Sequence, residues 1–163
     1  MRAWCARVRT VCASCPWRRL TVIGGVDGGW GMGYKILIAD DEAHIVHVLS
    51  MKLRNAGYTV MCAMDGEEAL ELCVSERPDL LITDNQMPYL SGIELSTRLH
   101  GMEYFGKLPT IMLTARGYDL GGEEIAAAGI ALVLAKPFSP REVLEHVKRL
   151  LGAEQPLSVA ETP

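Results

Sequence analysis

The sequence has no apolar run that approaches the roughly 18 residues needed to cross a bilayer, so we expect no membrane partner. A secretory signal is also missing, because the only apolar stretch after the basic start, at positions 20–23, is shorter than the 7–15 residues such a signal needs. The five cysteines are odd in number, which argues against a disulfide framework. Together these absences predict a cytoplasmic protein with reduced thiols.

An excess of positive charge is missing as well. The net charge is −4, and it is unevenly distributed along the chain. Residues 1–33 carry five arginines against one acidic residue, whereas residues 34–163 contain 11 basic and 19 acidic residues. Because an acidic chain repels the phosphate backbone, we expect no direct binding of nucleic acid.

Residues 1–33 also lack hydrophobic periodicity and are rich in glycine. Cys5, Cys12 and Cys15 could suggest zinc, but a fourth ligand is absent and the first histidine of the chain is His44. We therefore interpret residues 1–33 as a disordered or spurious N-terminal extension. By the same reasoning residues 153–163 form a flexible tail, which leaves residues 34–152 as the folded domain.

Within residues 34–152, short apolar runs alternate with segments of helical periodicity. We expect strands at 35–39, 58–63, 79–83, 110–113 and 130–135, each followed by a helix. Strands that are apolar throughout indicate burial on both faces. Five strands alternating with five helices predict the α/β class, with a doubly wound, five-stranded parallel sheet.

The sequence also predicts where several helices begin. Asp65-x-x-Glu68 and Ser91-x-x-Glu94 have the pattern of capping boxes, and Ser139 precedes a proline that suits the first position of the last helix. The fourth helix, expected at 120–128, contains Gly121 and Gly122, and each costs about 1 kcal/mol relative to alanine. We expect that helix to be short or mobile.

Polar residues follow the apolar strands at their carboxyl ends, where active groups gather in parallel sheets. They are Asp40 and Asp41, Asp84, Thr114 and Lys136. One aspartate at a strand end is usually the N-cap of the next helix, and Asp41 can be partly that. Three converging carboxylates repel one another unless a cation neutralises them, and oxygen ligands of this kind suit Mg²⁺. A hydroxyl and an ammonium beside them suit phosphoryl transfer.

Four segments in this order resemble the response-regulator receiver family, and the resemblance covers about residues 34–152. They are Ile-Leu-Ile-Ala-Asp-Asp-Glu at 36–42, Leu-Leu-Ile-Thr-Asp-Asn-Gln-Met-Pro at 80–88 with Gly92, Leu-Thr-Ala at 113–115, and Lys-Pro-Phe at 136–138. The resemblance implies a flavodoxin-like sheet with strand order 2-1-3-4-5. It is greatest to the stand-alone, single-domain type, similar to the chemotaxis response regulator.

The resemblance also implies a role for each matching residue. Asp84 is the phosphoacceptor. The metal ligands are Asp41, Asp84, Asp40 through water, and the backbone carbonyl of Gln86. The residues that bind the phosphoryl group or switch with it are Thr114, Ala115 and Lys136, and the bond from Lys136 to Pro137 is a cis peptide.

From the resemblance we expect a single-domain response regulator that receives its phosphoryl group from a histidine kinase or histidine phosphotransfer protein. Mg²⁺ is the expected cofactor. The signal would leave through the fourth helix, fifth strand and fifth helix, toward a protein target or a second copy of the chain. Val133 stands where the family often has an aromatic switch residue, which favours loop and helix movement over a ring flip. The four histidines are interpreted as surface groups, with His44 near the rim of the site.

Two other interpretations were weighed. A haloacid-dehalogenase-like phosphatase, which is an enzyme, also uses Asp, Thr, Lys and Mg²⁺, but its nucleophile lies in a DxD pair after the first strand. Here Asp40 and Asp41 are adjacent. The chain could also be a fragment of a larger regulator with a separate output domain, since the eleven residues after Gly152 are too few to form one. We expect no enzyme activity beyond Mg²⁺-dependent self-phosphorylation and dephosphorylation.

Overall fold

Five short strands form the centre of the protein, and each is followed by a helix in the sequence. The computed structural model describes residues 33–115 and 121–152. Its strands are β1 (Lys35–Ala39), β2 (Thr59–Ala63), β3 (Leu80–Asp84), β4 (Thr110–Ala115) and β5 (Ile130–Lys136). Its helices are α1 (Ala43–Asn55), α2 (Gly66–Glu76), α3 (Gly92–His100), α4 (Gly122–Ala127) and α5 (Pro140–Gly152).

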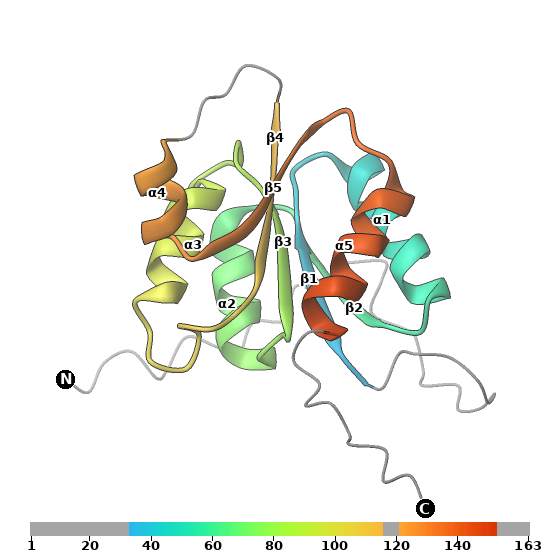
Figure 1. The fold of residues 1–163 in the computed structure, drawn as a ribbon, viewed down its shortest axis with the longest axis horizontal. Coiled ribbons are helices and arrows are strands. Elements are labelled where there is room, and N and C mark those ends of the chain that lie inside the picture. Colours follow the sequence, from blue (N-terminus) through green and yellow to red (C-terminus); the bar gives the residue numbers. More distant parts are fainter. Residues whose placement is uncertain (1–32, 116–120, 153–163) are drawn as a thin grey trace, which may run out of the picture.

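All strand pairs are parallel, and the order across the sheet is β2-β1-β3-β4-β5. The expected fold class and strand order are therefore confirmed. Helices α1 and α5 cover one face of the sheet, and α2, α3 and α4 cover the other (Figure 1). Because the strands are parallel, their carboxyl ends lie along one edge of the sheet, which is at the top of Figure 1.

Burial follows the position of each strand in the sheet. All five residues of β3 are buried, and so are four of the five in β1. The expectation of burial on both faces is wrong for the outer strands, because β2 and β5 each contain exposed and half-buried residues. An edge strand has a neighbour on one side only, and the helices cover the outer strands incompletely.

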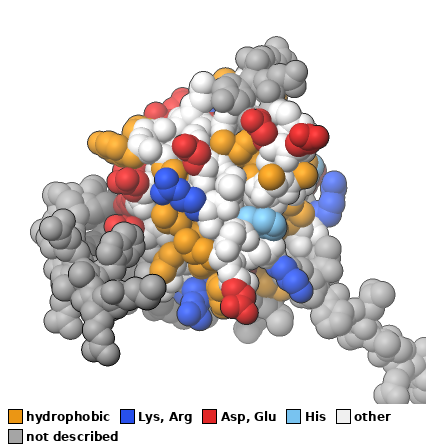
Figure 2. Space-filling model, turned by 90° about the vertical axis from the view of Figure 1, so that its left-hand side faces the viewer, with side chains coloured by type: hydrophobic (Ala, Val, Ile, Leu, Met, Phe, Trp, Pro, Cys, Tyr) orange, Lys and Arg blue, Asp and Glu red, His pale blue; other side chains and the backbone are white. Residues whose placement is uncertain are grey.

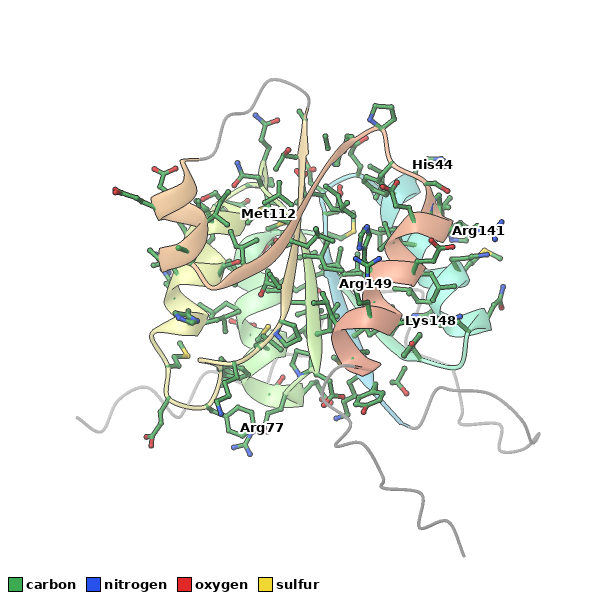
Figure 3. The ribbon with its side chains drawn as sticks, viewed as in Figure 1. His44, Arg77, Met112, Arg141, Lys148 and Arg149 are labelled. Atoms are coloured by element: carbon green, nitrogen blue, oxygen red, sulfur yellow. The ribbon has the colours of Figure 1, made fainter. Side chains whose placement is uncertain are left out.

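Helical periodicity explains how the two outer layers attach. In α1 the buried residues Val46, Leu49 and Leu53 recur every three or four positions and face the sheet. In α5 Val143 and Val147 repeat at an interval of four and join the same cluster. The opposite side of α5 is charged: Figure 3 labels Arg141, Lys148 and Arg149 along it, and all three are exposed. Each helix therefore buries one stripe and presents a polar face to water.

Only one of the two expected capping boxes forms completely. Ser91 accepts a hydrogen bond from the Glu94 N–H at 3.4 Å, and Glu94 accepts one from the Ser91 N–H at 3.0 Å. Asp65 does cap α2 by accepting from the Glu68 N–H at 2.8 Å. The second bond of this capping box, from the Asp65 N–H to Glu68, was predicted wrongly, however. Glu68 instead accepts a hydrogen bond of 2.9 Å from the Met64 N–H. The Glu68 side chain adopts a rotamer that reaches Met64, one residue before Asp65, and sequence spacing does not determine this rotamer.

Several other boundaries differ from the expectation by one or two residues. Strand β3 includes Asp84, and β4 continues through Thr114 and Ala115, because parallel pairing extends to the rim on both sides of β4. Helix α4 starts later and ends earlier than expected at 120–128, and it has no fully buried residue. Its C-terminal turn closes at Gly129, whose φ of +63° favours glycine.

Some expectations concern residues that the structure does not describe. The proposed N-terminal extension, apart from Gly33, and the proposed tail lie outside the described residues, as does Leu120 at the expected start of the fourth helix. Among the helices that are described, none has the length and apolar character required to span a membrane.

Candidate functional site

Strand register brings the predicted residues to the same edge of the sheet. Ala39 of β1 pairs with Thr83 of β3, so Asp40 and Asp84 occupy the next position on neighbouring strands. Asp84 pairs in turn with Leu113 of β4, and Thr114 follows that residue. The last pair of the β4–β5 ladder joins Ala115 to Lys136. Residues up to 96 positions apart in the sequence therefore meet at one rim.

The ammonium of Lys136 is the centre of the site. Its Nζ atom lies 3.0 Å from Asp40 Oδ2, 3.1 Å from Asp84 Oδ1 and 2.9 Å from Glu42 Oε1. The first two carboxylates are almost completely buried, whereas Glu42 is exposed. Burial alone would lower the pKa of Lys136, but hydrogen bonds to Glu42 and Asp40 outweigh it and raise this pKa above its ordinary value. Lys136 is therefore held firmly in its charged form.

Backbone groups position the two buried carboxylates. Asp40 Oδ1 accepts a hydrogen bond of 2.8 Å from the Glu42 N–H, and Asp84 Oδ2 accepts one of 3.0 Å from the Gln86 N–H. Burial raises the pKa of Asp40 above its ordinary value, and the neighbouring charge of Asp84 acts in the same direction. The bonds from Glu42 and Lys136 oppose this increase. The site thus holds more negative charge than Lys136 alone neutralises.

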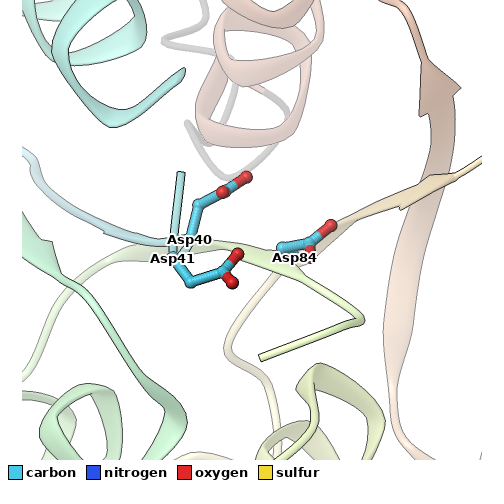
Figure 4. A group of neighbouring side chains, drawn as sticks. All are labelled: Asp40, Asp41 and Asp84. Atoms are coloured by element: carbon cyan, nitrogen blue, oxygen red, sulfur yellow. The ribbon is translucent and has the colours of Figure 1, made fainter. Parts of the chain in front are cut away.

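Asp41 completes a cluster of three carboxylates. One oxygen each from Asp40, Asp41 and Asp84 can be chosen so that all three lie within 4.8 Å of one another. Figure 4 shows these three side chains next to one another at the ends of β1 and β3. Asp41 is exposed, so water has access to the cluster. Oxygen-only donors of this number, with one side open to solvent, have the chemistry that Mg²⁺ prefers.

The remaining predicted residues also lie at this rim. Thr114 is buried within β4, and Ala115 is exposed at the end of that strand. Gln86 follows β3 and is exposed, with its N–H bound to Asp84 as described. The peptide bond between Lys136 and Pro137 is cis. Gly92 lies against the backbone of Asp84, and a Cβ at this position would overlap the backbone carbonyl oxygen of Asp84.

Glu42 is a site residue that the sequence interpretation did not assign. It belongs to the first motif, directly after the aspartate pair, but no role was inferred for it. The only available signal was its position: an acidic residue immediately after two strand-end aspartates lies close enough to meet a lysine from another strand end. Its contact with Lys136 joins residues 94 positions apart.

A cavity of about 650 Å³ opens beside this contact. Glu42, His44 and Lys136 contribute its polar lining, and Ile45, Val48 and Phe138 contribute apolar side chains. Figure 3 shows His44 at the start of α1, near the same edge of the sheet. All four histidines lie on helices, and His44, His47 and His100 are exposed while His146 is half-buried.

The sequence profile of the response regulator receiver domain matches residues 36–148 of this chain. The chain belongs to the response regulator receiver domain family. The match includes all of the strands except Lys35 at the start of β1, and it includes every residue of the acidic cluster. The resemblance inferred from the four motifs is therefore confirmed, and with it the assignment to two-component phosphorelay signalling.

Among curated proteins, this receiver domain is 40% identical over 128 residues to the alkaline phosphatase synthesis transcriptional regulatory protein PhoP of Bacillus subtilis. That alignment covers 74% of this chain and 49% of PhoP. The chain thus spans about half the length of the curated relatives it matches.

Solved structures show the same fold. The chemotaxis response regulator CheY4 of Vibrio cholerae is 33% identical, with a TM-score of 0.67 over 72% of this chain and 98% of CheY4. The receiver domain of the sensor histidine kinase PA1611 of Pseudomonas aeruginosa is 30% identical, with a TM-score of 0.66 over 74% of this chain and 98% of that domain. The PA1611 structure has a magnesium ion coordinated in its active-site cleft.

Proposed function

We propose that Asp84 accepts a phosphoryl group from a histidine kinase or a histidine phosphotransfer protein. The observation that carries this proposal is the position of Lys136, whose ammonium lies between Asp84 and Asp40 at 3.1 and 3.0 Å. This arrangement places a positive charge beside Asp84, next to the position that the oxygens of a phosphoryl group on Asp84 would occupy. Membership of the receiver family supports the same acceptor.

The carboxylates of Asp40, Asp41 and Asp84 would hold Mg²⁺, together with the backbone carbonyl of Gln86. The bound metal would supply positive charge that offsets the repulsion between Asp84 and an anionic donor. A carboxylate oxygen of Asp84 forms a bond to phosphorus as the bond from phosphorus to the donor's imidazole nitrogen breaks. Lys136 stabilises the charge on the transferred oxygens, and the Thr114 hydroxyl donates a hydrogen bond to one of them.

The output surface that we propose consists of α4, β5 and α5. Figure 2 shows the side of the molecule that carries α3 and α4, where hydrophobic and charged side chains are interspersed. Helix α4 has no fully buried residue, which makes it the helix with the least attachment to the core. Val133 in β5 is half-buried and packs against the small cluster beneath α4. A protein target or a second copy of the chain would bind here, in the cytoplasm.

We propose a signalling role without enzyme activity beyond the turnover of the chain's own phosphoryl group. A single-domain regulator is the first candidate. The second candidate is the receiver part of a larger transcriptional regulator, and it is favoured by one observation: PhoP is such a regulator by name, and this chain matches about half of it. In that case any contact with nucleic acid would belong to the output domain.

The direct test is incubation of the protein with acetyl phosphate and Mg²⁺, followed by mass spectrometry. The wild type should gain one phosphoryl group, mapped to Asp84 as a base-labile acyl phosphate. The Asp84→Asn variant should gain none, because its amide is no longer a nucleophile for phosphorus. An unchanged yield in this variant would disprove the assignment, and Glu71→Gln, at an exposed position in α2, provides the matched control.

A further inference from the structure

In this structure the ammonium of Lys136 donates hydrogen bonds to Asp40 and Glu42 and forms an ion pair with Asp84. An ammonium carries three N–H groups, and three carboxylates lie within 3.1 Å of Nζ: those of Asp40, Asp84 and Glu42. If Lys136 is to bind the oxygens of a phosphoryl group on Asp84, at least one of these contacts has to be released or rearranged. The three partners differ in how easily they can be released.

Asp40 is the partner that is hardest to release. Its side chain is 0% exposed, so the loss of Lys136 would leave a buried carboxylate without a cationic partner. Asp84 is 6% exposed and carries the phosphoryl group itself. Glu42, by contrast, is 58% exposed, so water can solvate its carboxylate as soon as Lys136 moves away. Of the three contacts, this is the one whose release costs least, because water can replace the ammonium at an exposed carboxylate.

The surroundings of Glu42 also leave room for it to move. Its side chain borders the cavity of about 650 Å³ that Lys136 and His44 also line. Its carboxylate does not cap α1, although its backbone carbonyl accepts the first helical bond from the Val46 N–H. The side chain can therefore rotate away from Lys136 without breaking a helical hydrogen bond.

We propose that Glu42 is a displaceable positioning residue: it holds Lys136 while Asp84 is unphosphorylated and competes with the incoming phosphoryl group for the ammonium. Glu42 thereby slows phosphorylation and weakens the binding of phosphoryl mimics. This inference rests on the proposed function, because it takes Asp84 as the acceptor. It assigns to this chain's own Glu42 a role separate from those of the metal ligands.

Two variants of Glu42 and one control distinguish the effect of its contact with Lys136 from the effect of its negative charge. Glu42→Ala removes both. Glu42→Asp keeps the charge but has a shorter side chain, and aspartate at this N-cap position is well suited to bind the free N–H groups of α1 and so to leave Lys136. Glu71→Ala removes the same charge from α2, on the other face of the sheet, and serves as the control.

The rate of phosphorylation by acetyl phosphate should rise about two- to fivefold in both Glu42 variants, the factor that corresponds to an exposed ion pair of up to about 1 kcal/mol. The beryllofluoride concentration that gives half of the maximal rise in Tm should fall by a similar factor. Glu71→Ala should match the wild type in both measurements.

Two results would overturn the role of Glu42 alone. One is a wild-type rate in both Glu42 variants. The other is acceleration in Glu42→Ala but not in Glu42→Asp, which would mean that only the negative charge matters and that the contact does not. If the wild type itself took up no phosphoryl group and did not respond to beryllofluoride, the proposed function would fall, and this inference with it.

Discussion

Asp40 is a buried carboxylate that has to share its cationic partner with two other residues. It is completely buried, burial raises its pKa, and its only cationic partner among the described residues is shared with Asp84 and Glu42. A buried carboxylate with one shared partner is destabilising unless a second cation is present. The arrangement is explained if the site is built to bind a divalent cation.

This argument leads to a prediction for Mg²⁺ binding without any phosphoryl group. At about ten times its Kd, Mg²⁺ should stabilise the wild type by about 1.4 kcal/mol and raise Tm by about 5 °C, because the ion binds only the folded cluster. Asp41→Ala should remove most of this gain, since Asp41 is the exposed carboxylate of the proposed ligand set. Differential scanning calorimetry measures both, and Asp65→Ala, outside the cluster, is the control. An equal Tm rise in Asp41→Ala would contradict the proposed ligand set.

At the scale of the element, α3 has the best-defined start of the helices. The Glu94 carboxylate accepts hydrogen bonds from the Ser91 hydroxyl at 2.7 Å and from the Ser91 N–H at 3.0 Å. These bonds lower the pKa of Glu94 below its ordinary value of 4.5. Residues 85–91 connect β3 to this helix, so the capping box also anchors the end of the segment that follows Asp84.

The lowered pKa makes this stabilisation dependent on pH. A carboxyl group with a depressed folded-state pKa stabilises the fold above 4.5, and that contribution disappears as the pH falls through the folded-state value. The difference in unfolding free energy between wild type and Glu94→Gln should therefore shrink between pH 7 and pH 3. Urea titrations at several pH values measure it, with the exposed Glu123→Gln as control. A difference that stays constant with pH would show that the ionised capping box is not the cause.

For the whole molecule, the question is how a change at Asp84 reaches the proposed output surface. Thr114 lies in β4, and the small cluster of Met112, Ala128 and Ile130 connects that strand with α4 and β5. This cluster is much smaller than the two that attach the other helices. A shift of Thr114 toward a phosphoryl group would therefore meet the least resistance in the direction of α4.

Amide hydrogen exchange with and without beryllofluoride and Mg²⁺ tests this route. We expect altered exchange in residues 121–135, because α4 has no buried residue and β5 follows it through the small cluster that contains Ile130. The Asp84→Asn variant, which cannot bind the mimic covalently, should show no such change. Altered exchange restricted to α2 and α3 would contradict the proposed output surface.

Local sequence patterns determined the elements and the identity of most site residues. Apolar runs specify strands because a strand buried on both faces needs no polar side chain, and the rule that active groups follow such strands selected Asp40, Asp41, Asp84, Thr114 and Lys136. The capping box at Ser91 was likewise readable, because its two hydrogen bonds connect residues only three positions apart.

Only the tertiary structure decided the contacts that depend on long-range register and side-chain rotamers. The ion pair of Glu42 with Lys136 joins two strand ends 94 residues apart, and Glu68 bonds to Met64 although spacing alone favoured Asp65. The ends of β3 and β4 were placed too early for the same reason, since pairing with neighbouring strands extends them to the rim. A local pattern specifies which residues reach an edge, but the packing of helices on both faces sets the distances between them.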